Sequence, residues 1–234
     1  MTMLNDTNTL PHHPLRHPDN KNLHLHYDDT FEGFQLMRDK GPFIRESLSA
    51  LKHTIDLALT DYSRILAFRV DLYVPKKIKL PDYAYTNKVI TKFFESFTKK
   101  IKYHQNRVAE RGYSRGCKVR YVWSREIGQG GRLHYHLLIL LNRDAYYKLG
   151  LLRSEKINMF RRIEESWASV LGLSIDQVRG LVNRPPNPEY FINREIRRDK
   201  VDELHELFFR ASYLCKKATK YFGDRQRSFD TSRG

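Results

Sequence analysis

Two histidines separated by a single residue begin an apolar stretch. His134 and His136 flank Tyr135 and lead directly into five consecutive aliphatic residues, 137–141, which is typical of a buried strand. Because side chains alternate between the faces of a strand, both imidazoles point the same way, with Cα atoms about 6–7 Å apart. Two imidazoles at this separation can hold one divalent metal ion. The pattern predicts a metal site on a core strand; the alternative is a pair of sheet histidines without a ligand.

Glu126 supplies a third candidate ligand. It closes a preceding strand predicted over residues 117–126, and the glycine-rich residues 128–131 predict an antiparallel hairpin between the two strands. The hairpin can bring the carboxylate to the histidine face. Two imidazoles and one carboxylate leave positions open for substrate oxygens, as a catalytic metal requires. Such a set suits Mg²⁺ or Mn²⁺ when a phosphate shares the ion, although imidazole also tolerates Zn²⁺.

Tyr213 and Lys216 form a second candidate pair. They lie three residues apart in a segment predicted to be helical, residues 201–221, with a break near Ala211 as the alternative; on a helix their side chains are expected to share a face. A phenol beside an ammonium has a stabilised phenolate, which can attack phosphorus. Alone, the pattern fits equally an amphipathic helix with a buried ring and solvated lysines, or lysines that contact phosphates. Its combination with the histidine strand favours a nucleophile.

The remaining periodicity predicts the elements that position these residues. Their order predicts an α+β domain with a mainly antiparallel sheet and helices packed largely on one face. Residues 1–35, polar and rich in proline and histidine, are predicted to be a flexible tail, and residues 36–234 the folded domain. A second pair, His24 and His26, falls in this tail and is expected to be disordered or to bind metal adventitiously. The other predicted elements are a helical pattern within residues 31–62, a strand over 64–74, helices over 88–109 and 154–171, a strand over 178–182 and an extension or edge at 190–193.

Composition points to a polyanionic partner. The 234 residues carry a net charge of +15 with a pI near 9.8, which favours nucleic acid over the alternative of a merely solvated basic surface. No apolar run approaches the ~20 residues that span a bilayer, so no membrane association is expected. The first twenty residues contain no apolar stretch of a signal peptide, and two cysteines make no disulfide framework. We therefore expect a cytoplasmic protein.

The ordered motifs resemble a known family. The string from Glu126 through Gly-Arg-Leu-His134-Tyr-His136, followed by Tyr213-Leu-Cys-Lys216, resembles the HUH endonucleases that initiate rolling-circle replication. More narrowly, it resembles the phage and prophage replication proteins of the inovirus gene II type, the YagK/YfjJ group. The strand around Arg69-Val-Asp71-Leu and residues 228–234 also resemble that group, and the likeness covers roughly residues 40–234.

The resemblance implies an RRM-like HUH sheet and a reaction. His134, His136 and Glu126 would bind the ion, which polarises the scissile phosphate of single-stranded DNA at a replication origin. Tyr213 would attack, giving a 5′-phosphotyrosyl adduct and a 3′-hydroxyl that primes synthesis, and reversal would rejoin the strand. Lys216 would position or neutralise the phosphate. DNA is also expected to contact Arg132, Lys217, Lys220 and the basic helix around residues 88–102. The expected protein partners are a helicase and a polymerase of the bacterial host.

The sequence departs from the family pattern at Tyr135, which is not a plain aliphatic residue, and at the position of a second tyrosine. Many such proteins carry two nucleophilic tyrosines four residues apart, and Lys217 occupies the second position here. Tyr221 lies eight residues along and is expected to pack or to contact DNA. Asp71 shares the surface of Arg69 and could approach the site, although a strand-end salt bridge is the favoured interpretation. The alternative function is a DNA-binding regulatory protein of a prophage whose endonuclease site has degenerated.

Overall fold

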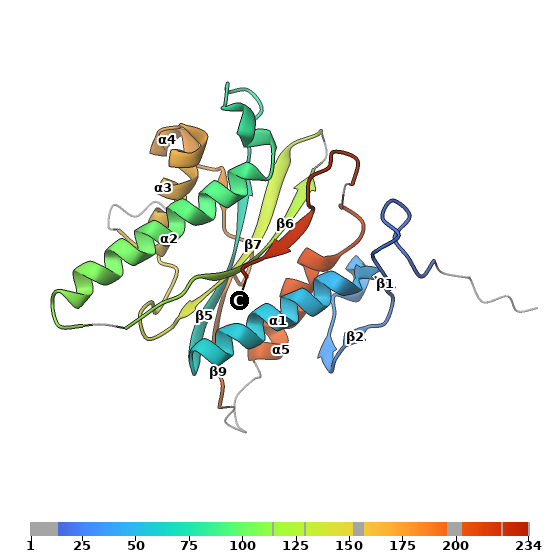
Figure 1. The fold of residues 1–234 in the computed structure, drawn as a ribbon, viewed down its shortest axis with the longest axis horizontal. Coiled ribbons are helices and arrows are strands. Elements are labelled where there is room, and N and C mark those ends of the chain that lie inside the picture. Colours follow the sequence, from blue (N-terminus) through green and yellow to red (C-terminus); the bar gives the residue numbers. More distant parts are fainter. Residues whose placement is uncertain are drawn as a thin grey trace, which may run out of the picture.

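The fold is built around one antiparallel sheet (Figure 1). The computed structural model describes residues 14–113, 115–128, 130–151, 157–195, 203–220 and 222–233. The sheet runs in the order β10-β6-β7-β5, and both β8 and β9 pair with the outer side of β5, one after the other. Its strands are β5 (Arg64–Tyr73), β6 (Arg120–Ile127), β7 (Leu133–Asn142), β8 (Val182–Asn183), β9 (Glu189–Asn193) and β10 (Phe229–Thr231).

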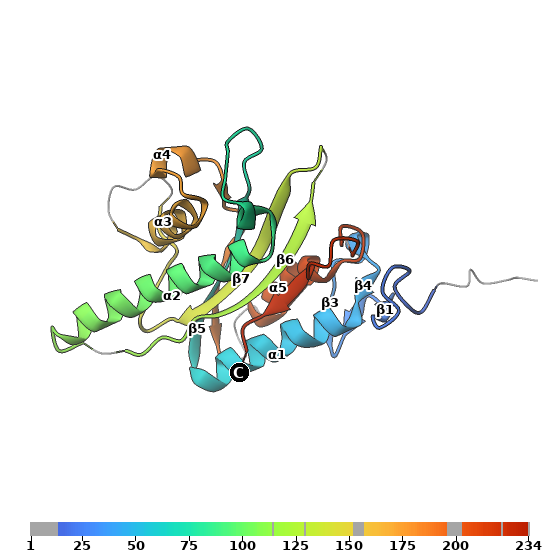
Figure 2. The ribbon, with the colours of Figure 1, turned by 45° about the horizontal axis from the view of Figure 1, so that its top comes forward.

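One face of the sheet is covered by α2 (Lys88–Ala109) and α3 (Met159–Leu171), with the short η2 (Asp82–Tyr85) and α4 (Ile175–Val178) beside them (Figure 2). The apolar stripe of α2 includes Phe93 and Phe97, both fully buried. These rings meet Trp167 of α3 and the odd-numbered side of β7, including Tyr135. This larger core holds the sheet's centre in place.

The opposite face is covered by α1 (Arg45–Asp61), α5 (Glu203–Ala211) and the 3₁₀ turn η3 (Ser212–Cys215). The expected α+β class is therefore confirmed, but the helices lie on both faces rather than largely on one. The reason is that β5 and β7 are apolar on both sides: Leu66 faces the first core, whereas Ile65, Leu138 and Leu140 face the second. A strand without a polar face needs cover on each side.

The N-terminal segment from residue 14 belongs to the folded domain. It contains β1 (Leu25–His26), β2 (Thr30–Phe31), β3 (Phe34–Gln35), η1 (Arg38–Lys40) and β4 (Phe43–Ile44), and β1 pairs with β4. Leu25 and Phe31 are buried, and Phe31 joins the second core. The predicted flexibility of residues 14–35 is thus wrong, because single apolar residues scattered among polar ones anchor the segment; the rest of that prediction, residues 1–13, lies outside the described residues.

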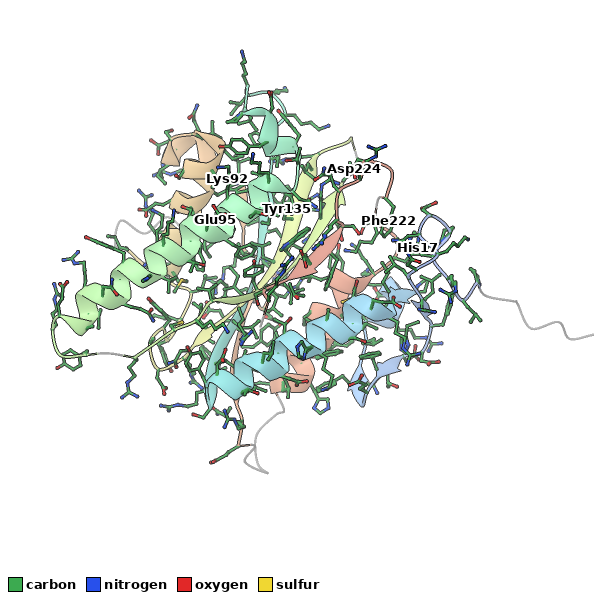
Figure 3. The ribbon with its side chains drawn as sticks, viewed as in Figure 1. His17, Lys92, Glu95, Tyr135, Phe222 and Asp224 are labelled. Carbon is green, nitrogen blue, oxygen red and sulfur yellow. The ribbon has the colours of Figure 1, made fainter. Side chains whose placement is uncertain are left out.

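The two histidines of this segment have local partners. His24 Nδ1 lies 2.7 Å from Glu46 Oε1, and His26 Nε2 lies 2.7 Å from the backbone oxygen of Thr30. Their predicted disorder is therefore wrong. Further upstream, buried His17 contacts the ring of Phe222 from the C-terminal loop, at 4.6 Å between ring centroids (Figure 3).

Three predicted elements have different limits in the structure. The helical pattern of residues 31–62 resolves into short strands followed by α1. Residues 178–182 contain the end of α4 and the start of β8. The last helix stops at Ala211, and the chain continues through η3 and a loop into β10. No helix among the described residues combines the length and hydropathy that crossing a bilayer demands.

Candidate metal centre

Three neighbouring strands place the candidate ligands on one surface. In the β6–β7 register, Glu126 is opposite His134 and Ser124 is opposite His136. In the β5–β7 register, Tyr73 is opposite His134 and Asp71 is opposite His136. Since cross-strand partners point to the same face, these six side chains share the sheet face covered by α1 and α5. Tyr135 points the other way, toward α2 (Figure 3).

The three predicted ligands converge. One donor atom each from Glu126, His134 and His136 lies within 4.8 Å of the others. Glu126 Oε2 is 3.3 Å from His136 Nε2 and 3.7 Å from His134 Nε2. All three residues are buried, Glu126 to 3% exposure. The prediction that the hairpin brings Glu126 to the histidine face is confirmed.

The donor set fits a divalent cation. Glu126 Oε1 and His136 Nε2 are buried and make no hydrogen bond, which is costly for polar atoms unless something satisfies them. His134 Nδ1 lies 3.3 Å from the backbone oxygen of Arg132, and His136 Nδ1 bonds Asp71, so each ring keeps Nε2 for a ligand. Two imidazole nitrogens and a carboxylate oxygen are donors that Mn²⁺ and Zn²⁺ accept, and Mg²⁺ accepts when substrate oxygens complete the shell.

The electrostatics keep the carboxylate ionised. Burial alone would raise the pKa of Glu126, but His136 and Lys220 outweigh it and lower the pKa to about 2. For His136, burial opposes ionisation, whereas the carboxylates of Asp71 and Glu126 raise its pKa above the usual value. Burial and the neighbouring His136 lower the pKa of His134. The Glu126 carboxylate is therefore ionised at neutral pH, next to the two imidazoles.

Asp71 is a residue of the site that the sequence analysis did not favour. Its Oδ1 lies 2.6 Å from His136 Nδ1, so the carboxylate faces the candidate metal centre instead of a salt bridge at the strand end. The available signal was its place on the opposite face of β5 from Leu66, Val70 and Leu72. The face of β5 alone does not show that Asp71 reaches His136; the β5–β7 register is also needed.

Tyr213 and Lys216 reach the same surface by an unexpected route. Tyr213 lies in η3, and Lys216 follows that turn, where it forms an isolated bridge with Phe43; the two residues do not share an α-helix. Their side chains nonetheless meet, since Lys216 Nζ is 3.5 Å from the Tyr213 ring centroid. The same ammonium is 3.2 Å from Glu126 Oε2. The half-buried Tyr213 ring also contacts His136 edge-on, at 5.1 Å between centroids.

The residues predicted to contact DNA differ in their burial and in their partners. Lys220 is buried and its ammonium donates a hydrogen bond to the hydroxyl of Ser124, so the prediction that it contacts DNA is wrong. Burial lowers its pKa to about 8 even though Glu126 opposes that shift. Lys217 is half-buried, with its backbone N–H bonded to Pro42. Arg132 is half-buried over the Tyr73 ring, and Tyr221 lies outside the described residues.

By its fold and its site, this is an α+β protein that carries a candidate metal centre of two histidines and one glutamate on an antiparallel sheet. The chain belongs to the family described as the YagK/YfjJ C-terminal domain, whose model matches residues 26–232. It is 33% identical over 193 residues to "Uncharacterized protein YfjJ" of Escherichia coli (strain K12), covering 79% of this chain and 92% of that protein. It is 32% identical over 198 residues to "Uncharacterized protein YagK" of the same strain, covering 82% and 94%.

Proposed function

We propose that this protein nicks and rejoins single-stranded DNA through a covalent tyrosine intermediate. The observation that carries the proposal is the placement of a phenol next to a candidate metal centre. Tyr213, His136, Glu126 and Lys216 come from three separate parts of the chain and meet on one sheet face. The sequence resemblance to HUH endonucleases, including their RRM-like sheet, supports the same assignment.

Each residue has a role in the proposed reaction. Glu126 and the Nε2 atoms of His134 and His136 would hold a divalent ion, which when bound withdraws charge from the scissile phosphate. Tyr213 Oη loses its proton to solvent and attacks phosphorus, so that a P–Oη bond forms as the P–O3′ bond breaks. The departing 3′-oxygen takes up a proton and becomes a 3′-hydroxyl. The phosphodiester energy is kept in the tyrosyl linkage, and attack by that hydroxyl reverses the step.

Lys216 is suited to assist Tyr213. Its ammonium lies over the face of the Tyr213 ring, in a cation–π contact, and its ion pair with Glu126 fixes its position. When an ion occupies the centre, the ammonium can turn from the carboxylate to a phosphate oxygen. We extend the proposal, on the sequence resemblance, to initiation of rolling-circle replication of a phage or prophage genome in the bacterial cytoplasm, with host helicase and polymerase as partners.

The test is capture of the adduct. Protein is incubated with Mn²⁺ and a randomised single-stranded DNA pool, and products are separated on a denaturing gel and sequenced. We expect a protein–DNA adduct that Tyr213→Phe abolishes and Tyr147→Phe retains, because Tyr147 is 65% exposed and lies beyond Asn142, at the far end of β7 from the histidines. Binding without an adduct would contradict the proposal and favour the regulatory alternative.

A further inference from the structure

A basic loop lies against the hairpin that carries the histidines. The chain leaves β5 at Tyr73, and Lys76, Lys77 and Lys79 follow as exposed residues. The backbone N–H of Val74 donates to Leu133 of β7, at 3.0 Å. A Cβ added at Gly131, in the hairpin loop, would lie 3.6 Å from Lys76 Nζ. The lysine loop and the hairpin end are therefore neighbours.

Arg132 connects this loop to the candidate metal centre. Its guanidinium carbon is 4.6 Å from the Tyr73 ring centroid, and Tyr73 stacks on His134 with centroids 5.2 Å apart and planes 15° apart. The backbone oxygen of Arg132 is also 3.3 Å from His134 Nδ1. A cation at Arg132 is thus separated from a candidate ligand by one aromatic ring. We call Lys76, Lys77, Lys79 and Arg132 the basic rim.

The cations of the basic rim have no carboxylate partner in the part of the chain that the structure describes. Among the residues that the structure describes, no carboxylate lies within ion-pair distance of any of the four. On α2, Lys100 pairs with Glu165 at 3.6 Å, whereas the exposed Lys99 and Lys102 have no ion pair among the described residues, so the position of the basic rim is what separates it from α2. Unpaired cations on exposed loops favour a polyanion whose phosphates replace the missing counter-charges.

The position of the basic rim also distinguishes it from α2. Helix α2 covers the sheet face opposite to His134 and His136. A single DNA strand bound along α2 would therefore have to pass around the sheet to reach the candidate metal centre (Figure 2). The basic rim lies where β5 ends and β7 begins, next to the register pair of Tyr73 and His134. A single DNA strand that crosses the basic rim reaches the candidate metal centre directly.

From these contacts, we propose that the basic rim is the track that carries the backbone of single-stranded DNA into the candidate metal centre. This inference rests on the proposed function, and it replaces the basic helix of residues 88–102 as the main DNA contact. Lys76, Lys77 and Lys79 contact successive phosphates, and Arg132 contacts the phosphate nearest the centre.

The test compares two triple variants with equal loss of charge. One changes Lys76, Lys77 and Lys79 to Ala; the matched control changes the exposed Lys99, Lys102 and Arg107 of α2 to Ala. Affinity for a labelled single-stranded oligonucleotide is measured by fluorescence anisotropy across a salt series, with thermal melts confirming that both variants fold. Each phosphate contact on a single strand contributes about 0.7 to the slope of log affinity against log salt.

We expect the rim variant to bind at least about tenfold more weakly and to lose about 2 from the slope, as three lost contacts predict. The α2 variant should change the slope by less than about 0.7, one contact's share. Equal losses in both variants, or a larger loss in the α2 variant, would overturn the track. So would an equal loss of affinity for a duplex of the same sequence, since the rim would then be a duplex-binding surface.

The outcome is separable from that of the proposed function. In one outcome, the salt dependence of affinity falls only in the rim variant and the unaltered protein forms no adduct. The proposed DNA track is then supported and the nicking proposal fails. If the unaltered protein forms the adduct while the rim variant keeps its full slope, the nicking proposal stands and the track fails.

Discussion

The Asp71 carboxylate accepts a hydrogen bond from His136, with Asp71 Oδ1 and His136 Nδ1 2.6 Å apart. The two residues are direct partners in the β5–β7 register, so the contact is fixed by backbone pairing as well as by side-chain rotamers. Because Nδ1 is committed to Asp71, Nε2 is the nitrogen directed at Glu126, 3.3 Å away, and the one that an ion would bind after displacing any proton there. Asp71 is therefore a positioning residue for the candidate metal centre.

Loss of this contact is expected to weaken metal binding. Asp71→Ala frees the imidazole to rotate and to change tautomer, and outer-shell partners of this kind are worth about 10–100-fold in metal affinity. Calorimetric titration with Mn²⁺ measures the effect, and nitrogen NMR of the metal-free protein reports the tautomer of His136. Asp230→Ala on β10 is the control. Unchanged affinity together with an unchanged tautomer in Asp71→Ala would show that Asp71 does not position the ring.

Lys216 is expected to oppose metal binding while assisting catalysis. Its ammonium and a divalent ion share the same oxygen, Glu126 Oε2, so Lys216→Met should tighten Mn²⁺ binding about fivefold, equivalent to roughly 1 kcal/mol. The same variant should form the DNA adduct more slowly, because the cation beside Tyr213 is gone. Lys217→Met serves as the control for metal affinity. Weaker Mn²⁺ binding in Lys216→Met would refute the shared-oxygen interpretation.

Both cysteines are expected to resist alkylation in the native protein. Burial raises the pKa of Cys117 to about 12, against the opposing effect of the Asn142 N–H, and burial raises that of Cys215 to about 12. At pH 8 only about one thiol in ten thousand would then be a thiolate, which is the reactive form. Mass spectrometry after iodoacetamide treatment should find modification only in denaturant. Rapid labelling of Cys117 without denaturant would mean that the segment before β6 opens readily.

The helices on the second face are expected to contribute strongly to stability. Leu51 on α1 is fully buried in the second core, so Leu51→Ala should lower the free energy of unfolding by about 2–5 kcal/mol. Leu151→Ala, at a residue that is 76% exposed, should change it by less than about 0.5 kcal/mol. Denaturant titration followed by circular dichroism measures both. Equal, small changes would mean that α1 is not needed to cover the sheet.

The local sequence pattern predicted the positions of the three candidate ligands better than the positions of the residues around them. Alternation along β7 was enough to place His134 and His136 on one face, and the short hairpin was enough to bring Glu126 beside them. Asp71 could not be placed, because the pairing of β5 with β7 joins residues far apart in the chain. Nothing in a single strand encodes which residue of a distant strand will be its neighbour.

The C-terminal end of the last helix was a second feature that the sequence pattern did not locate. The pattern of residues 201–221 is amphipathic, but the chain leaves the helix after Ala211 and passes through η3. That change moves Lys216 against Glu126 and buries Lys220 against Ser124. Whether a lysine meets solvent or a carboxylate is decided by tertiary packing, which overrides local propensity.

Strand β6 is paired on both sides, with β7 along one edge and β10 along the other, and the Arg125–Asp224 ion pair ties it to the C-terminal loop. The backbone at Glu126 is therefore held by β7 on one edge, two residues beyond the part of β6 that also pairs with β10. A chelator should empty such a centre without unfolding the domain, unlike small zinc domains that collapse when stripped. We expect protein treated with EDTA to stay folded and to bind Mn²⁺ after dialysis against that ion, without a refolding step.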